Sequence, residues 1–335
     1  MSIPLIAEQR AAFSRGGVPA PRQAADGVWS IPIPLTGSPL ISMFMYLVDT
    51  PRGLVLIDAG FDSRTAWTAL LDGLRAAGTT PSEITATVLT HNHPDHIGLA
   101  DRLRAEGGAA VAIHPLDCFA AQRAIRGGFL DQLARALLLA GVPDPERETM
   151  LDSARALAVH SESLVPDVLL NEGDTVGDGL EVLHTPGHTY GHIALRDHAR
   201  GLVFTGDLLM PTGEPQLAPV SLDGDDPGAE LAVSLDRIAA LPAALVLPGH
   251  QYPIADHARR GRAVLAEHRA RLAETAEAAA RAETAWEVAA LLRWARPWAE
   301  MGTTAKRFAV VQTLGLLRAL QRGADAPSAT HSGFS

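Results

Sequence analysis

The sequence predicts a mixed α+β region followed by a mainly helical extension, and two observations support this prediction. Between residues 28 and 255, short apolar runs with strand-like alternation recur between turns rich in glycine, proline and aspartate. From 256 to 323 the strand pattern stops, and alanine, arginine and glutamate follow one another at helical spacing. With 335 residues, the chain can form one large domain with an appendage, or two ordinary domains.

Within this division, each element is expected from its local pattern. Residues 1–27 form a lead-in, and a helix over 63–77 is indicated by Trp67, Leu70 and Leu74 at helical spacing. Further helices are expected at about 97–106 and 229–240. The expected strands cover residues 28–33, 43–48, 53–58, 84–90, 109–114, 167–170, 180–183, 192–195, 201–204 and 244–247.

Two stretches depart from the strand-rich pattern. Residues 117–164 are rich in alanine and leucine at helical spacing, so we expect a helical insertion over one face of the domain. Its leucines are expected to bury themselves against the strand-rich domain, while another face lines an entrance. The polar tail over 324–335 is expected to be disordered.

The composition narrows the class of protein. The 28 Lys and Arg are outnumbered by 38 Asp and Glu, and this acidic balance argues against a nucleic-acid partner. A single cysteine excludes an intrachain disulfide and a cysteine-rich zinc site. No apolar run approaches the roughly 18–20 residues that span a bilayer, and the first residues do not read as a secretory leader. A cytoplasmic protein without a membrane partner is therefore expected.

The densest chemical signal is the run His-Asn-His-Pro-Asp-His over residues 91–96. A strand leads into it, and in an extended segment His91 and His93 point to the same side. Pro94 then turns the chain, and Asp95 and His96 open a helix. Imidazole and carboxylate donors together suit zinc, iron or manganese. The run therefore predicts a metal site at a strand-to-helix junction.

Three more candidate ligands each follow an apolar strand and a glycine. They are His188, Asp207 and His250. The glycine lets the backbone turn tightly where the strand ends. Side chains at the ends of several strands can converge on one rim of a sheet, so we expect these three to join the histidine run.

Taken together, these residues resemble the signature of the metallo-β-lactamase superfamily. The matching positions in chain order are Asp58, His91, His93, Asp95, His96, His188, Asp207 and His250. The resemblance covers about residues 28–253 and implies a four-layer αββα sandwich of two mixed sheets, with helices outside and metal ions at one edge. The helical tail, with Trp286 and Trp294, resembles the winged-helix-like extension of the lactamase-B2-like branch.

The resemblance also implies two divalent ions, with zinc expected and iron or manganese as alternatives. One ion would be bound by His91, His93 and His188, and the other by Asp95, His96 and His250. Asp207 would bridge both ions. Asp58 would brace the histidine loop by hydrogen bonding rather than bind an ion.

A site of this kind favours hydrolysis. Two divalent ions, two aspartates and a bridging hydroxide leave a net charge of about +1, which stabilises an anionic transition state. Metal ions also lower the pKa of water towards about 7, so the hydroxide serves as the nucleophile. Asp95 is the residue expected to orient this hydroxide and to relay its proton. The expected enzyme is a binuclear metal-dependent hydrolase.

The substrate is a separate question. An apolar flap beside a metal rim favours a thioester or related ester of a small acyl compound, as in glyoxalase-II-like enzymes, with a lactone second. A lysine and arginine set for glutathione is not evident. An endoribonuclease is a further alternative, which the acidic balance and the few aromatic residues disfavour. Minor alternatives are β-lactam hydrolysis, a mononuclear iron dioxygenase and a non-catalytic interaction protein.

Four other polar residues lie near these motifs. Tyr190 and His114 are candidates for contacting substrate, although a hydrogen-bonded structural role is favoured for both. His184 and His192 flank His188 and are expected to be structural. The sequence leaves the oligomeric state open, with a dimer as one option.

Overall fold

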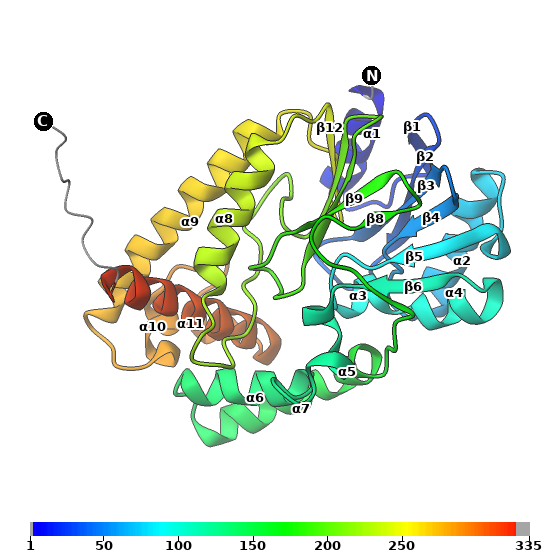
Figure 1. Cartoon of the computed structure of the whole chain (residues 1–335). Helices are drawn as coiled ribbons and strands as arrows, with labels where there is room; N and C mark the ends of the chain where they lie inside the picture. The colour runs from blue at the N-terminus through cyan, green and yellow to red at the C-terminus, as the bar shows by residue number, and fades with distance from the viewer. Residues whose placement is uncertain (1–2, 326–335) are drawn as a thin grey trace, which may run out of the picture.

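Two β-sheets packed face to face, with helices on both outer faces, form the centre of the molecule (Figure 1). This computed structural model describes residues 3–325. The seven-stranded sheet has the order β1-β2-β3-β4-β5-β6-β7 and the five-stranded sheet the order β12-β11-β10-β9-β8. The first sheet is antiparallel from β1 to β4 and parallel from β4 to β7. The predicted αββα sandwich is confirmed.

The bounds of the elements are as follows. The strands are β1 (Arg22–Ala25), β2 (Val28–Pro34), β3 (Ser42–Thr50), β4 (Gly53–Ile57), β5 (Ile84–Val88), β6 (Ala110–Ile113), β7 (Val168–Leu169), β8 (Thr175–Val176), β9 (Leu180–His184), β10 (Ile193–Asp197), β11 (Leu202–Gly206) and β12 (Leu245–Pro248). The helices are α1 (Ile3–Ser14), α2 (Arg64–Ala76), α3 (Pro94–Ile97), α4 (Ala100–Gly107), α5 (Phe119–Gln122), α6 (Phe129–Leu139), α7 (Asp144–Glu162), α8 (Pro227–Ala240), α9 (His257–Ala279), α10 (Ala285–Leu291) and α11 (Thr303–Asp325), with 3-10 turns at η1 (Pro81–Glu83), η2 (Pro115–Asp117) and η3 (Trp298–Glu300).

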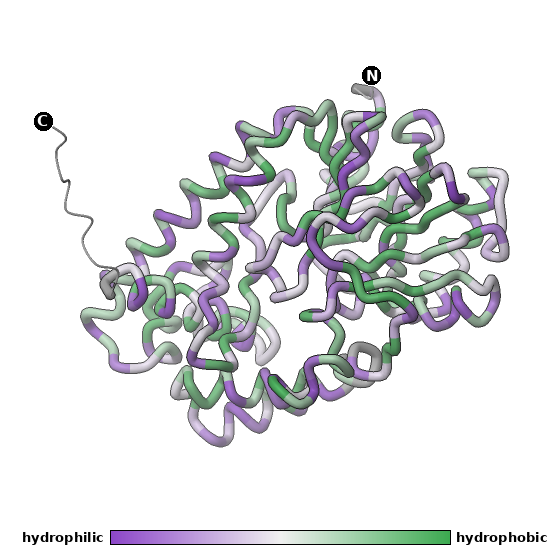
Figure 2. The backbone as a smooth tube through the Cα atoms, viewed as in Figure 1, coloured by the Kyte–Doolittle hydropathy of each residue, from purple (hydrophilic) through white to green (hydrophobic). Residues whose placement is uncertain are grey.

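Strand β3 shows why the centre of the sandwich is apolar on both sides of the sheet. Successive side chains of a strand point to opposite faces. Met43 and Met45 join the cluster under helices α2 and α4, whereas Phe44 and Tyr46 join the core between the two sheets. Each fully buried side chain of this kind stabilises the fold by about 1.5–3 kcal/mol. The hydropathy colouring shows the same strands as a mainly apolar centre (Figure 2).

Helix α2 covers the outer face of the seven-stranded sheet, as its spacing predicts. Ser63 caps its N-terminus by accepting a hydrogen bond from the backbone N–H of Ala66. Trp67, Leu70 and Leu74 then face the sheet and are buried. The five-stranded sheet is covered by α8, and α9 packs on α8 in turn.

The helical insertion consists of α5, α6 and α7, so its predicted helical character is confirmed. The expectation that its leucines pack against the sandwich holds for Leu164, which joins the cluster under α2 and α4, but is wrong for the leucines of α6. Leu133 and Leu137 of α6 are buried in a shared cluster with Val310 and Leu314 of α11. Figure 1 shows α6 and α7 lying beside α11. The apolar face of the insertion therefore packs against the C-terminal helices.

The region after residue 255 is mainly helical, as predicted. From 256 to 325 it contains α9, α10, η3 and α11, and this described stretch has no strand, so no β-hairpin wing accompanies the helices. Of the tail expected to be disordered, residues 324 and 325 belong to α11, and 326–335 lie outside the described residues. None of the helices described between residues 3 and 325 is long and apolar enough to cross a membrane.

The lead-in contributes to the sandwich. Strand β1 pairs antiparallel with β2 and extends the seven-stranded sheet at its edge. Leu5 of α1 joins the core between the sheets, and Gln9 donates a 3.0 Å hydrogen bond to the hydroxyl of Ser30 in β2. The first sheet thus begins at Arg22.

Candidate metal centre

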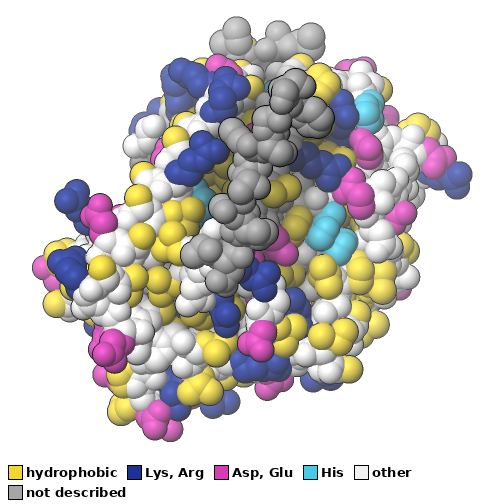
Figure 3. Space-filling model, turned by 60° about the vertical axis from the view of Figure 1, so that its left-hand side comes forward, with side chains coloured by type: hydrophobic (Ala, Val, Ile, Leu, Met, Phe, Trp, Pro, Cys, Tyr) yellow, Lys and Arg dark blue, Asp and Glu magenta, His cyan; other side chains and the backbone are white. Residues whose placement is uncertain are grey.

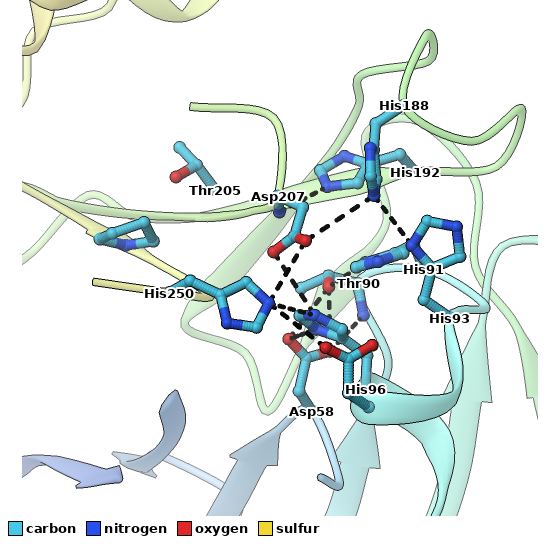
Figure 4. Close-up of polar contacts among 12 residues, drawn as sticks. Asp58, Thr90, His91, His93, His96, His188, His192, Thr205, Asp207 and His250 are labelled. Atoms are coloured by element: carbon cyan, nitrogen blue, oxygen red, sulfur yellow. Dashed lines mark hydrogen bonds and ion pairs between the residues drawn. The ribbon is translucent and has the colours of Figure 1, made fainter. Parts of the chain in front are cut away.

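The ends of strands from both sheets bring the predicted ligands together at one edge of the sandwich (Figure 4). The loop with His91 and His93 follows β5, and the short helix α3 carries Asp95 and His96. His188 lies in the loop between β9 and β10. Asp207 and His250 follow the parallel strands β11 and β12. Each predicted ligand therefore lies beyond the end of a strand, as the sequence predicts.

Two glycines allow this close approach, for different reasons. Gly206 has a φ of 46°, and a Cβ there would lie 2.7 Å from Oγ1 of Thr90. Gly249 does not need an unusual backbone, but a Cβ there would lie 2.6 Å from Oδ1 of Asp207 and 2.8 Å from Cε1 of His96. The predicted tight turn thus applies to Gly206 and to Gly187, whose φ is 128°, whereas Gly249 provides space.

The donor atoms form two groups, and within each group they lie within 4.8 Å of one another. The first group is His91, His93, His188 and Asp207, and the second is Asp95, His96 and His250. Nε2 of His188 lies 3.0 Å from Nδ1 of His93, and Nε2 of His96 lies 3.3 Å from Nε2 of His250. Two nitrogens that bind one tetrahedral zinc at about 2.1 Å lie roughly 3.4 Å apart. These spacings resemble a coordination sphere.

The Asp207 carboxylate lies between the two groups (Figure 4). Its Oδ1 is 3.4 Å from Nε2 of His96. Its Oδ2 is 3.4 Å from Nε2 of His250 and 3.8 Å from Nε2 of His188. One carboxylate thus faces ligand atoms of both groups, which is the position required of a bridging ligand.

Hydrogen bonds on the far side of the rings fix which nitrogen faces the centre. Nδ1 of His188 donates to the backbone oxygen of Gln216 at 2.8 Å, and Nδ1 of His250 donates to that of Ser42 at 3.0 Å. A ring that donates from Nδ1 presents a lone pair at Nε2. Such outer partners orient the histidine ligands of metal sites and set their tautomer.

Asp58 braces the histidine loop, in the manner that the resemblance implies. It accepts hydrogen bonds from the backbone N–H and the hydroxyl of Thr90, at 2.8 and 2.9 Å, and from Nδ1 of His96 at 2.8 Å. The Thr90 hydroxyl lies 3.0 Å from Nδ1 of His91. Asp58 is buried and belongs to neither donor group.

The electrostatics differ between the two groups. Burial and the nearby His188 lower the pKa of His93 to about 3, and burial lowers that of His91. These rings are therefore neutral, as a ligand must be. Burial acts against charge on His250 as well, but Asp207 and Asp95 outweigh it and raise the pKa of His250 to about 10. The carboxylates of the second group thus stabilise positive charge at this place, which a bound divalent cation would supply in place of the ring proton of His250.

Two buried atoms test whether these residues fit a metal ion. Nε2 of His91 and Oδ1 of Asp207 are buried and have no hydrogen-bond partner among the described residues. Buried polar atoms are nearly always hydrogen-bonded, so an unpartnered pair within a ligand group calls for a further partner. The neutral imidazoles and the carboxylates are donors for a divalent cation. The residues therefore fit the metal that the signature implies.

The other residues singled out in the sequence lie beside this centre. The Tyr190 hydroxyl donates to the backbone oxygen of Pro219 at 2.9 Å, and the His114 ring stacks on His184 at 4.2 Å between centroids. These contacts support structural roles for Tyr190 and His114. His192 accepts a hydrogen bond from the backbone N–H of Asp207.

The structure adds a residue that the sequence reasoning missed. Asp117 is buried and accepts hydrogen bonds from the two loops that carry the histidines of the first group. Its sequence signal is weak: an aspartate two residues after a proline, beyond the end of β6.

Comparisons with known proteins agree with the fold and the site. Residues 42–250 match the family model of the metallo-beta-lactamase superfamily. A probable metallo-hydrolase of Bacillus subtilis is 33% identical over 220 residues, which cover 63% of this chain and 68% of that protein. A hydroxyacylglutathione hydrolase of Fuscovulum blasticum is 31% identical over 201 residues, 57% of this chain and 60% of that protein. The crystal structure of a metallo-beta-lactamase family protein from Thermus thermophilus has a TM-score of 0.73 at 28% identity, covering 90% of this chain and 95% of that one.

The chain belongs to the metallo-beta-lactamase superfamily. It is a hydrolase of a family that binds divalent metal, and its cluster of His and Asp side chains could hold such an ion.

Proposed function

We propose that the protein is a binuclear metal-dependent hydrolase that cleaves a thioester or related ester of a small acyl substrate. The observation that carries the binuclear proposal is the division of the donor atoms into two groups with Asp207 between them. His91, His93 and His188 would hold one ion, Asp95, His96 and His250 the other, and Asp207 both. The imidazole-rich donor set supports zinc.

When bound, such ions polarise a carbonyl group and lower the pKa of water. The protein supplies the surroundings for this chemistry. Among the seven proposed ligands, only His93 and Asp95 are not fully buried, so the substrate would approach between these two side chains. The five others are shielded from solvent, and exclusion of water would strengthen the attraction between bound cations and a developing negative charge on the substrate.

Asp95 is the residue proposed to handle the proton. Its Oδ2 lies 3.4 Å from Nε2 of His250, and its side chain is 26% exposed. Burial acts against its charge, but His96 and His250 outweigh this effect and hold the pKa of Asp95 below its ordinary value. The carboxylate is therefore ionised at neutral pH. It can accept a hydrogen bond from an attacking water and pass the proton towards solvent.

Exposed apolar residues whose chain neighbours or backbone contact the ligand loops support an acyl substrate. Leu116 and Ile125, which flank Asp117 and Arg126 in the chain, are 36% and 64% exposed. Phe308 of α11 is 46% exposed, and its backbone oxygen accepts a hydrogen bond from the side chain of Gln216. This chain is similar to a hydroxyacylglutathione hydrolase, and the name of that protein indicates a thioester substrate.

Other substrates have less support. The net charge of −10 disfavours an RNA substrate. On the face that carries α9 to α11, outside the atoms drawn in grey, Lys and Arg side chains occur together with acidic and apolar ones (Figure 3). A continuous basic groove, which single-stranded RNA requires, is not visible on that part of the face. A lactone remains the second candidate, because the same apolar surroundings would accept it.

A substrate panel tests the proposal. Thioesters, lactones, a cephalosporin and single-stranded RNA would be assayed on protein whose metal content has been measured. We expect a preference of more than about tenfold for a thioester, equal to roughly 1.4 kcal/mol of transition-state binding. Turnover of lactone or RNA with that preference would overturn the substrate class.

The His93→Ala variant links activity to the metal. It removes a ligand at the accessible side of the centre, so both metal content and turnover should fall. His198→Ala is a matched control, because His198 is exposed and pairs with Glu181 away from the donor groups. Full activity in a metal-depleted His93→Ala protein would contradict the mechanism.

A further inference from the structure

Asp117 occupies an unusual position in the chain. It is the last residue of η2 and the first residue of the helical insertion, yet it is 2% exposed and contacts the loops of the metal centre. It is not among the donor groups that could hold an ion. A buried carboxylate that binds neither a metal nor a basic side chain carries a large desolvation cost, so its contacts call for a functional explanation.

Each of these contacts reaches a loop that carries proposed ligands. Oδ2 accepts a hydrogen bond from the backbone N–H of Asn92 at 3.1 Å, between His91 and His93. The same oxygen accepts from the hydroxyl of Thr189 at 2.5 Å, and Oδ1 accepts from the backbone N–H of Gly191 at 2.7 Å. One side chain thus ties the His91–His93 loop to the loop of His188.

Asp117 packs tightly against the loop that carries His188. A Cβ added at Gly191 would lie 2.4 Å from the backbone nitrogen of Asp117 and 2.8 Å from its Cβ. Between Thr189 and Gly191, the ring of Tyr190 is covered by the guanidinium of Arg126 at 3.9 Å. The three residues after His188 are therefore all in contact with the insertion: Thr189 and Gly191 with Asp117, and Tyr190 with Arg126.

We propose that Asp117 is a positioning residue of the metal centre, which sets the separation between His188 and the pair His91 and His93 and thereby the affinity for the ion they share. Burial raises the pKa of Asp117 to about 6, against the three hydrogen bonds that lower it. The fold therefore keeps a carboxylate where its charge is costly. Its three donors come from two separate loops, which a neutral residue could not hold in the same way.

The test is the metal affinity of Asp117→Asn. An amide has one accepting oxygen and an NH2 group that would face N–H and O–H donors, so the two loops lose their common partner. Zinc content would be measured by mass spectrometry while a chelator is titrated. We expect one of the two ions to be lost at a 10- to 100-fold lower chelator concentration than in the wild type. Mutating the hydrogen-bond partner of a metal ligand typically weakens metal affinity by this factor. His188→Ala identifies which ion this is.

The matched control is Asp197→Asn. Asp197 is also buried, and it accepts hydrogen bonds from the backbone N–H and the guanidinium of Arg200 in the turn between β10 and β11. This variant should retain both ions at wild-type affinity. If Asp117→Asn releases zinc as Asp197→Asn does, or if it releases both ions equally, Asp117 does not position this ligand set.

A second variant covers the case in which Asp117→Asn fails to fold. Thr189→Val removes one donor to Asp117 and keeps the shape of the side chain. It should weaken the same ion in the same direction, with thermal unfolding of the metal-free protein measured alongside. A fall in the unfolding temperature with unchanged zinc affinity would show a merely structural role and would overturn the proposal.

The inference rests on the metal role proposed for His91, His93 and His188, and the two can fail separately. If the wild-type protein binds no ion that His188→Ala abolishes, the proposed ligand set is wrong. If the wild-type protein binds that ion and Asp117→Asn retains it, only the role of Asp117 is wrong.

Discussion

The carboxylate of Asp58 lies 2.8 Å from Nδ1 of His96 and accepts its hydrogen bond, so that Nε2 of the same ring faces Asp207. Asp58 has a φ of 63°, a backbone conformation that few residues besides glycine, asparagine and aspartate adopt. Asp58 thus adopts the positive φ that the backbone needs at this position, and its hydrogen bond sets the tautomer of His96.

Replacing Asp58 with asparagine separates these two roles, because asparagine tolerates the same φ. Its amide can donate to Nδ1 of His96, which would move the ring proton to Nε2 and block the lone pair. We expect a 10- to 100-fold weaker affinity for the ion bound by His96, measured by chelator competition.

Asp178→Asn provides the control for Asp58→Asn. Asp178 has a φ of 58°, but it is exposed and pairs with Arg52 away from the centre. Its variant should bind zinc like the wild type. Equal affinities in the Asp58 and Asp178 variants would show that the hydrogen bond to His96 does not tune the metal site.

Gly249→Ala tests the close approach of the two groups. The new Cβ would meet Oδ1 of Asp207 at 2.6 Å, so that carboxylate or His96 must move. We expect loss of at least one ion, seen as a lower metal content, and a fall in turnover. Gly224→Ala is the matched substitution, since no atom lies within 4 Å of a Cβ there. Full metal content in Gly249→Ala would mean that the space is not needed.

Arg126→Ala tests how the insertion is attached. Its guanidinium makes two hydrogen bonds to the carboxylate of Asp225, at 2.8 and 3.0 Å, and the side chains are 13% and 2% exposed. Removing one partner of a buried pair leaves an uncompensated charge, so the free energy of unfolding should fall by about 3 kcal/mol. Urea unfolding would measure this.

The comparison for Arg126 is Arg155→Ala, which breaks an exposed pair with Asp152 on α7. Such a pair contributes at most about 1 kcal/mol. A loss in Arg126→Ala no larger than that in Arg155→Ala would indicate that the Asp225 contact does not stabilise the protein.

The stacked pair His114 and His184 predicts a pH dependence of stability. Burial and the neighbouring His184 lower the pKa of His114 from 6.5 to about 4. Between these values the unfolded chain binds a proton at this position and the folded chain does not. The contribution to stability is therefore complete above about pH 6.5 and is lost as the pH falls towards 4.

His114→Phe keeps an aromatic ring in the stack and removes the titrating group. Urea unfolding of the metal-free protein between pH 4 and 7 should show a flatter pH dependence for His114→Phe than for the wild type. His198→Phe, at an exposed histidine, should follow the wild type. Parallel curves for the wild type and His114→Phe would refute the assignment.

The sandwich and the cluster could be predicted because their signals are local. Residues 91–96 place four donors side by side in the sequence, and the glycines before His188, Asp207 and His250 mark the strand ends. The order of these positions then identifies the arrangement in space, because strands that end at a common rim bring their following residues together.

Two features escaped prediction for a physical reason. The partners of Asp117 include the backbone N–H groups of Asn92 and Gly191. Almost every residue has a backbone N–H group, so the sequence does not indicate which of them will donate to a given carboxylate. The stripe of Leu133 and Leu137 on α6 fits any apolar surface, so the pattern could not say whether the sandwich or α11 would cover it. Both depend on contacts between segments that are remote along the chain.

The core shared by α6, α7 and α11 has a consequence for how the protein forms. Leu133 and Val310 are separated by more than half of the chain, so the insertion leaves the ribosome well before its partner helix. Until α11 is synthesised, the part of this apolar cluster that Val310 and Leu314 cover stays exposed, and such exposed surfaces promote aggregation. The sheets can pair earlier, whereas the cluster shared by α6, α7 and α11 can be completed only after α11 has been synthesised.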